Sequence, residues 1–373
     1  MTIDVLERNP QAETRLKVID CDIHPTMGSL SDLNPFLAKR WQEHIVTYGE
    51  FVRQGLAKTL SHPRMQPAVS RADAWPPGGG LPGSHLPFMQ EQHLDPNGVA
   101  FGVLQPLRPN GNSQRNLEFG AALSSALNQW QLEHWTGRDK RLKGSIAVTQ
   151  EWPEAAIKEI ERHAGNPDFI QISLPPRSDE PLGRRRYWPI YREAVEHGLP
   201  IGLHVSGVNG HTSTASGSPS FYIEEHHNNV QSMQGLVTSL VLEGVFEEFP
   251  SLKVVLIEGG FGWVPALSWR LDRHWAKMRD EVPHLKRPPS EYIREHIWYT
   301  TQPIEEPETP EDLIHLFDWI GWDRLLFSTD YPHWDFDDPH TVFKVKLSEA
   351  QKQQLFYGNA AKLYGLGSMT RPQ

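Results

Sequence analysis

The sequence predicts one (β/α)₈ TIM barrel that uses the whole chain, residues 1–373, with inserted loops at the carboxyl face of the barrel. Three observations lead to this fold class. Short apolar runs alternate with stretches of helical period, which is the pattern of a parallel sheet with crossover helices. The apolar runs number eight. No glycine-rich phosphate loop follows the first run, which favours a closed barrel over an open doubly wound sheet.

The predicted strands are separated by Gly and Pro, which punctuate a chain because they favour turns. In chain order the strands occupy residues 17–24, 99–105, 142–148, 169–174, 200–206, 253–258, 297–301 and 325–330. The predicted helices carry apolar residues at intervals of three or four. These helices occupy residues 116–135, 153–163, 188–197, 230–249, 264–279, 310–320 and 349–364.

Two segments are longer than ordinary strand–helix connections. Residues 51–95 hold no clear strand and include the turn-rich WPPGGGLPGSH at residues 75–85. A second insertion spans residues 207–229. Each follows a predicted strand, on the face where barrel enzymes keep their chemistry, so we expect loops or lids over a site rather than a further domain.

Composition excludes several classes of protein. Lys and Arg number 36 and Asp and Glu number 46, a net charge of −10 that disfavours nucleic acid and anionic membranes as partners. No apolar stretch is long enough to span a membrane. The single cysteine, Cys21, cannot form an intramolecular disulfide, and residues 1–17 lack the apolar core of a signal peptide. We therefore expect a cytoplasmic enzyme with a small-molecule substrate.

The first predicted strand, KVIDCDIH, carries unusual polar residues. Its two-residue period predicts that an apolar side faces the helices and a polar side faces the barrel interior. The predicted interior side consists of Val18, Asp20, Asp22 and His24, and the outer side of Ile19, Cys21 and Ile23. Buried charges cost several kcal/mol unless they are compensated. Either a metal ion, a buried cation or turn capping would compensate these carboxylates.

Two later strands bring similar residues to the same end of the barrel. The run PIGLHVS places His204 on the interior side, and LLFSTDYPH places Asp330 at the mouth. A lone histidine on an apolar strand is usually a core residue, but three converging strands make a ligand set the better interpretation. Two imidazoles and two carboxylates suit one divalent ion, Zn²⁺ first and Mn²⁺ second, with a position left for water or substrate.

The ordered motifs resemble the metal-dependent amidohydrolase superfamily, in the branch related to aminocarboxymuconate semialdehyde decarboxylase. The motifs are DCDIHP at 20–25, GLHVSG at 202–207, EGGFGWVP at 258–265, RLDRHW at 270–275 and FSTDYPHWD at 327–335. The resemblance covers residues 18–366 and implies a mononuclear site held by Asp22, His24, His204 and Asp330. It also implies that Asp330 shuttles a proton. Together with the Trp-rich helices, it suggests a homodimer.

Two departures from the family pattern bear on the reaction. The first motif is often His-x-His or Glu-x-His, whereas this chain has Asp22 and His24, which leaves the metal open. On the sixth strand the decarboxylases generally carry a histidine that contacts substrate, whereas this chain offers Glu258, on the predicted interior face with Val254 and Leu256. A carboxylate there would repel a substrate carboxylate. We therefore expect hydrolysis of a neutral carbonyl substrate rather than decarboxylation.

Three further residues are candidates for substrate contact. His333 follows Asp330 at the mouth, where capping a loop is an equally good interpretation. His227, with its neighbour His226, lies on the second insertion and would reach over the mouth unless it is a solvated loop end. Trp263 follows Glu258, and its helical spacing also fits plain packing.

The leading hypothesis is a hydrolase in which a metal-activated water attacks a small cyclic or aromatic carbonyl substrate. Asp330 would take the proton of the water and Glu258 would orient the substrate. The alternative is a nonoxidative decarboxylase of an aromatic or unsaturated acid, and the third is a binding protein without catalysis. The first two share the same ligands and differ in their products.

Overall fold

The computed structural model describes residues 17–49, 67–109, 111–205, 214 and 216–367, and within them one sheet of eight parallel strands in sequential order. The strands are β1 Val18–Ile23, β2 Val99–Leu104, β3 Leu142–Ala147, β4 Phe169–Leu174, β5 Ile201–His204, β6 Val254–Ile257, β7 Ile297–Thr300 and β8 Leu325–Leu326. Ile23 bridges Tyr331 in parallel, and the Cys21 N–H donates to the Phe327 carbonyl at 3.0 Å. These bonds join β1 to β8 and the residues that follow it, 327–331, which we call the β8 segment. The sheet is thereby closed, which confirms the predicted TIM barrel.

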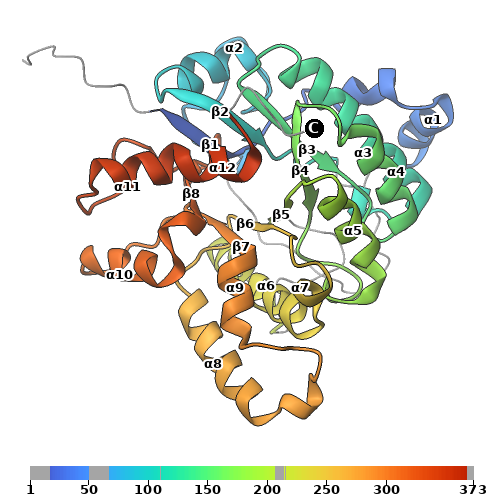
Figure 1. Cartoon of the computed structure of the whole chain (residues 1–373). Coiled ribbons are helices and arrows are strands. Elements are labelled where there is room, and N and C mark those ends of the chain that lie inside the picture. The colour runs from blue at the N-terminus through green and yellow to red at the C-terminus, as the bar shows by residue number, and fades with distance from the viewer. Residues whose placement is uncertain (1–16, 50–66, 110, 206–213, 215, 368–373) are drawn as a thin grey trace, which may run out of the picture.

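Helices surround the strands on all sides (Figure 1). The first six α-helices along the chain are α1 Lys39–Tyr48, α2 Leu86–Met89, α3 Leu117–Gln131, α4 Pro153–His163, α5 Trp188–Glu196 and α6 Tyr222–Leu242. The six that follow are α7 Val245–Glu248, α8 Val264–Lys277, α9 Pro289–His296, α10 Glu311–Ile320, α11 Glu349–Gln353 and α12 Asn359–Tyr364. None of the described helices is both long and apolar enough to cross a bilayer.

The helices differ from the prediction at several places. The helix predicted at residues 230–249 begins earlier, at Tyr222, so the second insertion ends inside α6. The helix predicted at 349–364 is interrupted by a π turn at Gln354–Gly358. The sequence analysis missed α1 and α9, although Trp41 of α1 and Tyr292 and Ile293 of α9 are buried.

The first insertion lies against the carboxyl end of β1. Its residues 51–66 fall outside the described part of the chain, as do residues 207–213 and 215 of the second insertion. The Thr26 N–H donates to the Gly83 carbonyl at 2.9 Å, within the turn-rich segment 75–85. Gly83 has φ +74°, and a Cβ there would collide with the His24 carbonyl. Glycine is therefore required where this loop crosses the end of β1.

A β-bulge interrupts the alternation of side chains along β1. Asp20 pairs with Gly102 of β2, and Ile23 pairs with Leu104. Three steps along β1 thus match two steps along β2, so β1 holds one extra residue. Side chains before and after such a bulge follow opposite alternations, which the two-residue period of the sequence cannot reveal.

The interior face of β1 is consequently different from the predicted one. Ile19 and Cys21, predicted to face the helices, belong to a buried cluster built from alternate strands: Val103 of β2, Ile170 of β4, Val255 of β6 and Leu326 of β8. Contacts among strands that are not neighbours run through the inside of a barrel. Only after the bulge do Asp22 and His24 turn inward.

The prediction that Asp20 faces the interior is therefore wrong. Its carboxylate lies 2.8 Å from Nε2 of His93, which belongs to the π turn Gln90–Leu94 outside the barrel. It also accepts a hydrogen bond from the Thr329 N–H at 2.9 Å. Asp20 and His93 are fully buried. Asp20 thus joins β1 to the β8 segment and to the surrounding layer, rather than facing a ligand.

A buried histidine on α9 gives the fold a pH dependence of its own. His296 is 2 % exposed, stacks on Phe246 and bonds through Nδ1 to the Leu252 carbonyl at 2.9 Å. Burial lowers the pKa of His296 below its usual value. The folded state therefore binds fewer protons than the unfolded state, and stability is lost as pH falls through the unfolded pKa of about 6.5.

We expect the wild type to lose more unfolding free energy than His296→Gln when the pH drops from about 7.5 to about 5.5, by up to roughly 1.4 kcal/mol per pH unit. Urea denaturation of both proteins at the two pH values measures the difference. Because the other titrating groups are common to both proteins, equal losses would show that His296 does not contribute.

Candidate metal centre

Five acidic and imidazole side chains meet at the carboxyl end of the barrel. Asp22 and His24 come from the end of β1, His204 from the end of β5, Glu258 directly follows β6, and Asp330 follows β8. Asp22 and Asp330 are fully buried, and His24 and His204 are only 2 % and 3 % exposed. The carboxyl ends of parallel strands share one face, so residues far apart in the sequence converge.

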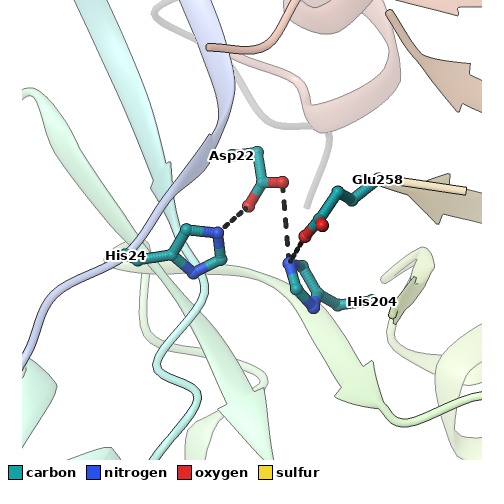
Figure 2. A group of neighbouring side chains, drawn as sticks. All are labelled: Asp22, His24, His204 and Glu258. Atoms are coloured by element: carbon teal, nitrogen blue, oxygen red, sulfur yellow. Dashed lines mark ion pairs between the residues drawn. The ribbon is translucent and has the colours of Figure 1, made fainter. Parts of the chain in front are cut away.

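Four of these side chains point at a common centre (Figure 2). Asp22 places Oδ1 3.2 Å from Nε2 of His24 and Oδ2 3.6 Å from Nε2 of His204. Glu258 Oε2 lies 3.2 Å from the same His204 nitrogen. One potential ligand atom from each of the four residues lies within 4.8 Å of the others. This spacing suits a shared cation.

The hydrogen bonding of these residues tests whether they fit a metal ion. Nδ1 of His24 lies 2.8 Å from the Gln105 carbonyl, so it carries the proton and Nε2 presents its lone pair to the centre. Both Asp22 carboxylate oxygens, Nε2 of His24 and both His204 ring nitrogens make no hydrogen bond to the described residues. Buried polar atoms rarely lack a hydrogen-bond partner, and a divalent ion bound by these nitrogen and oxygen atoms would replace the missing partners. The donors therefore fit a metal.

Asp330 stands beside this centre in a strained conformation. Its φ is +62°, a region that non-glycine residues seldom adopt. Oδ1 of Asp330 lies 2.7 Å from Nε2 of His24 and 2.7 Å from Nδ1 of His333, and Oδ2 accepts from Nε2 of Gln302 at 3.4 Å. Burial and the nearby charge of Glu258 raise the pKa of the Asp330 carboxyl. The arrangement can hold and release a proton at the centre.

His333 is brought to the site, as the sequence suggested. Its ring stacks on that of His24 with centroids 4.2 Å apart. Burial lowers the pKa of His333 to about 3. A neutral His333 donates its Nδ1 proton to Asp330 and thereby orients that carboxyl.

Glu258 reaches the site by a different route from the predicted one. Val254 and Leu256, placed with it on the interior face, instead pack in the outer core, while Val255 and Ile257 face inward. Glu258 joins the interior because its backbone is left-handed, with φ +57°. The residue alternation along β6 was therefore assigned to the wrong side, and the left-handed turn restores Glu258 to the centre.

A second histidine pairs with Glu258 from helix α6. Nε2 of His226 lies 3.3 Å from Oε1 of Glu258 and 3.2 Å from Oδ2 of Asp335. Burial disfavours the Glu258 carboxylate, but the neighbouring imidazoles of His204 and His226 outweigh it and lower the pKa of Glu258 to about 2. The charge of Glu258 is thus shared by two imidazoles.

Two of the residues predicted to contact substrate lie elsewhere. His227 is exposed, because consecutive residues of α6 point about 100° apart and His226 takes the inward direction. Trp263 packs against the core, and its indole N–H donates to the carbonyls of Gly259 at 3.0 Å and Gly260 at 3.1 Å. Trp263 therefore braces the turn after Glu258.

The sequence analysis missed two polar residues at the site. Nε2 of Gln302 donates to Oδ2 of Asp335 at 3.0 Å as well as to Asp330. Gln302 comes shortly after β7, so the strand-end rule that singled out Asp330 would have found it. Asp335 closes the quoted motif FSTDYPHWD but lies beyond any predicted element.

A pocket opens beside His204 on the side of β2 to β5. The strand ends, the β2–α3 loop and helix α3 form its wall, with Gln105, Leu107, Leu127, Val148, Leu174 and His204 among the lining residues. The acidic and imidazole groups around Asp330 come from β6 to β8 and α6. The centre thus has a flank without Lys, Arg, Asp or Glu among its described lining residues, and a charged flank.

A closed β/α barrel with buried carboxylates and imidazoles on the ends of β1, β5 and β8 defines a metal-dependent barrel enzyme. The chain belongs to the amidohydrolase family, whose model, Amidohydro_2, matches residues 19–366. It is an enzyme of the amidohydrolase superfamily, as the motifs suggested.

Several similar proteins are decarboxylases, and another is a 2-keto-4-carboxy-3-hexenedioate hydratase of Sphingobium sp., 24 % identical over 241 residues. The gamma-resorcylate decarboxylase of Polaromonas sp. (strain JS666) is 28 % identical over 249 residues, 64 % of this chain and 75 % of that protein. The 2-amino-3-carboxymuconate-6-semialdehyde decarboxylase of Dictyostelium discoideum is 24 % identical over 252 residues, 65 % and 67 % of the two chains. The dihydroxybenzoic acid decarboxylase structure from Polaromonas sp. JS666, with bound manganese and 2-nitroresorcinol, has a TM-score of 0.63 at 21 % identity over 94 % and 98 %.

Proposed function

We propose that the chain is a divalent-metal-dependent nonoxidative decarboxylase of an aromatic carboxylic acid. The observation that carries this proposal is the placement of the buried Asp330 carboxyl against the centre formed by Asp22, His24 and His204. The names of the two decarboxylase relatives support the decarboxylase alternative over the hydrolase that the sequence favoured.

The argument for hydrolysis rested on repulsion between Glu258 and a substrate carboxylate. Glu258 lies 3.3 Å from His226 and beside the centre that would hold a divalent ion, so its negative charge has close partners. A paired carboxylate repels a neighbouring anion much less than a free one. Glu258 is therefore compatible with an acid substrate, and we assign it the role of orienting the substrate.

Asp22, His24, His204 and Asp330 would hold one ion, which supplies positive charge to grip the substrate carboxylate and an adjacent oxygen. Zn²⁺ and Mn²⁺ both accept such mixed nitrogen and oxygen ligands. Mn²⁺ draws support from the manganese bound in the similar dihydroxybenzoic acid decarboxylase.

The reaction requires one proton at the ring carbon that bears the carboxylate. Protonated Asp330 donates it, the bond between the ring and the carboxylate then breaks, and its electron pair restores the aromatic ring as CO₂ leaves. Asp330 is left ionised and takes a new proton from solvent. His333, 2.7 Å from Asp330, keeps the carboxyl oriented through the cycle.

The test compares protein loaded with Mn²⁺ or Zn²⁺ and chelator-treated protein on hydroxylated benzoic acids, with acid consumption and CO₂ release both measured. We expect equal amounts of the two in the loaded protein and roughly 10³-fold slower turnover after chelation, because the ion supplies several kcal/mol of transition-state stabilisation. Turnover that survives chelation, or a product that has gained an oxygen from water, would contradict the proposal.

A further inference from the structure

The pocket beside His204 contains a buried amide group whose hydrogen-bonding capacity is unused by the described residues. Gln105 directly follows β2 and is 2 % exposed. Neither Oε1 nor Nε2 of its carboxamide has a hydrogen-bond partner among the described residues. Leaving a buried amide without partners costs about 1–3 kcal/mol, so such a group indicates a ligand that supplies the missing partner.

The backbone of Gln105 is fixed from two sides. Its N–H donates to the Ile23 carbonyl at 2.8 Å, and its carbonyl lies 2.8 Å from Nδ1 of His24. The side chain of Gln105 is therefore attached to a backbone that is held in place beside His24. Gln105 lines the same pocket as His204. A molecule gripped at the centre that extends into this pocket comes within reach of the carboxamide.

The rest of the pocket wall suits a flat, neutral group. Leu107, Leu127, Val148 and Leu174 contribute apolar surface, and Asn112, Ser124 and Ser173 contribute polar but uncharged surface. Among the described residues that line this pocket, none is Lys, Arg, Asp or Glu. An aromatic ring fits such a wall, whereas a second ionised substituent would be buried there without a partner.

We infer that Gln105 is a specificity-determining residue that hydrogen-bonds a neutral hydroxyl substituent on the ring of the substrate. This inference rests on the proposed function and assigns to Gln105 the recognition of one ring hydroxyl. A carboxamide can donate through Nε2 and accept through Oε1, so it matches a hydroxyl, which also does both. The carboxylate end lies at the metal centre, and the hydroxyl points into the pocket.

The test is calorimetric binding to the Mn²⁺-loaded protein, so it does not depend on turnover. The probes are 2-hydroxybenzoate and its 2,3-, 2,4-, 2,5- and 2,6-dihydroxy counterparts. In the wild type we expect one isomer to bind roughly 10-fold more tightly than 2-hydroxybenzoate, the gain from one additional neutral hydrogen bond. In Gln105→Met, a side chain of similar length without the amide, that gain should disappear while 2-hydroxybenzoate still binds.

Two controls separate specificity from structural damage. The metal content of Gln105→Met should equal that of the wild type, because the carbonyl that orients His24 belongs to the backbone. Gln353→Met, at an exposed position on α11, should keep the wild-type preference.

The outcomes distinguish this inference from the proposed function. A preference that persists in Gln105→Met, or equal binding of all probes by the wild type, would overturn the role of Gln105 alone. Failure of the loaded wild type to bind any of these acids would overturn the proposed function together with the inference.

Discussion

Asp330→Asn is expected to lose turnover of an aromatic acid by roughly 10³-fold, the usual contribution of a positioned general acid. The amide cannot supply the proton that the ring carbon needs. We expect the loss in kcat rather than in KM, because the substrate carboxylate is gripped by the centre and not by the transferred proton. Steady-state kinetics of the metal-loaded variant measures the effect.

The substitution is suited to this position. Asparagine tolerates the left-handed region better than most residues, so the φ of +62° remains accessible. The amide is similar in size and keeps an oxygen that can accept from His333. We therefore expect a folded protein with nearly unchanged circular dichroism. A folded, metal-loaded variant with the wild-type rate would remove Asp330 from the proton transfer.

His204→Ala is expected to abolish stoichiometric metal binding. Both His204 ring nitrogens make no hydrogen bond to the described residues, and Nε2 lies near both Asp22 and Glu258. Removing the ring deletes one ligand and leaves two buried carboxylates with less compensation. Elemental analysis of protein purified without chelator should give roughly one equivalent in the wild type and well below half of that in the variant.

A thermal readout complements metal content, because a ligand that binds only the folded state raises the melting temperature. Added Mn²⁺ or Zn²⁺ should stabilise chelated wild type and leave His204→Ala unchanged. His315→Ala, at an exposed position on α10, is the matched control and should behave as the wild type. Equal metal content in all three proteins would show that the ligand set is wrong.

The barrel could be predicted because its signals are local. Each strand is a short apolar run bounded by turn residues, and the eight strands of the structure fall within the predicted ranges. The helices α1 and α9 were missed because single amphipathic stretches of ten and eight residues give a weak periodic signal.

The direction of individual side chains was less predictable, because it depends on backbone departures from regular strand geometry. The bulge in β1 sends Asp20 outward, and the left-handed turn at Glu258 reverses the expected face of β6. Neither position holds a glycine, the residue that would have indicated an unusual backbone conformation in the sequence. The contact of His226 with Asp335 depends on how helix α6 is placed over the mouth, which strand patterns do not specify.

The most direct test of the central claim is the fate of isotopes in one reaction. Metal-loaded protein is given a hydroxylated benzoic acid labelled with ¹³C in its carboxylate, in D₂O enriched with ¹⁸O, and the products are read by NMR and mass spectrometry. Decarboxylation predicts labelled CO₂ and a phenol that carries one deuterium at the carbon that lost the carboxylate. Absence of labelled CO₂, or a product that retains the ¹³C label, would contradict the account.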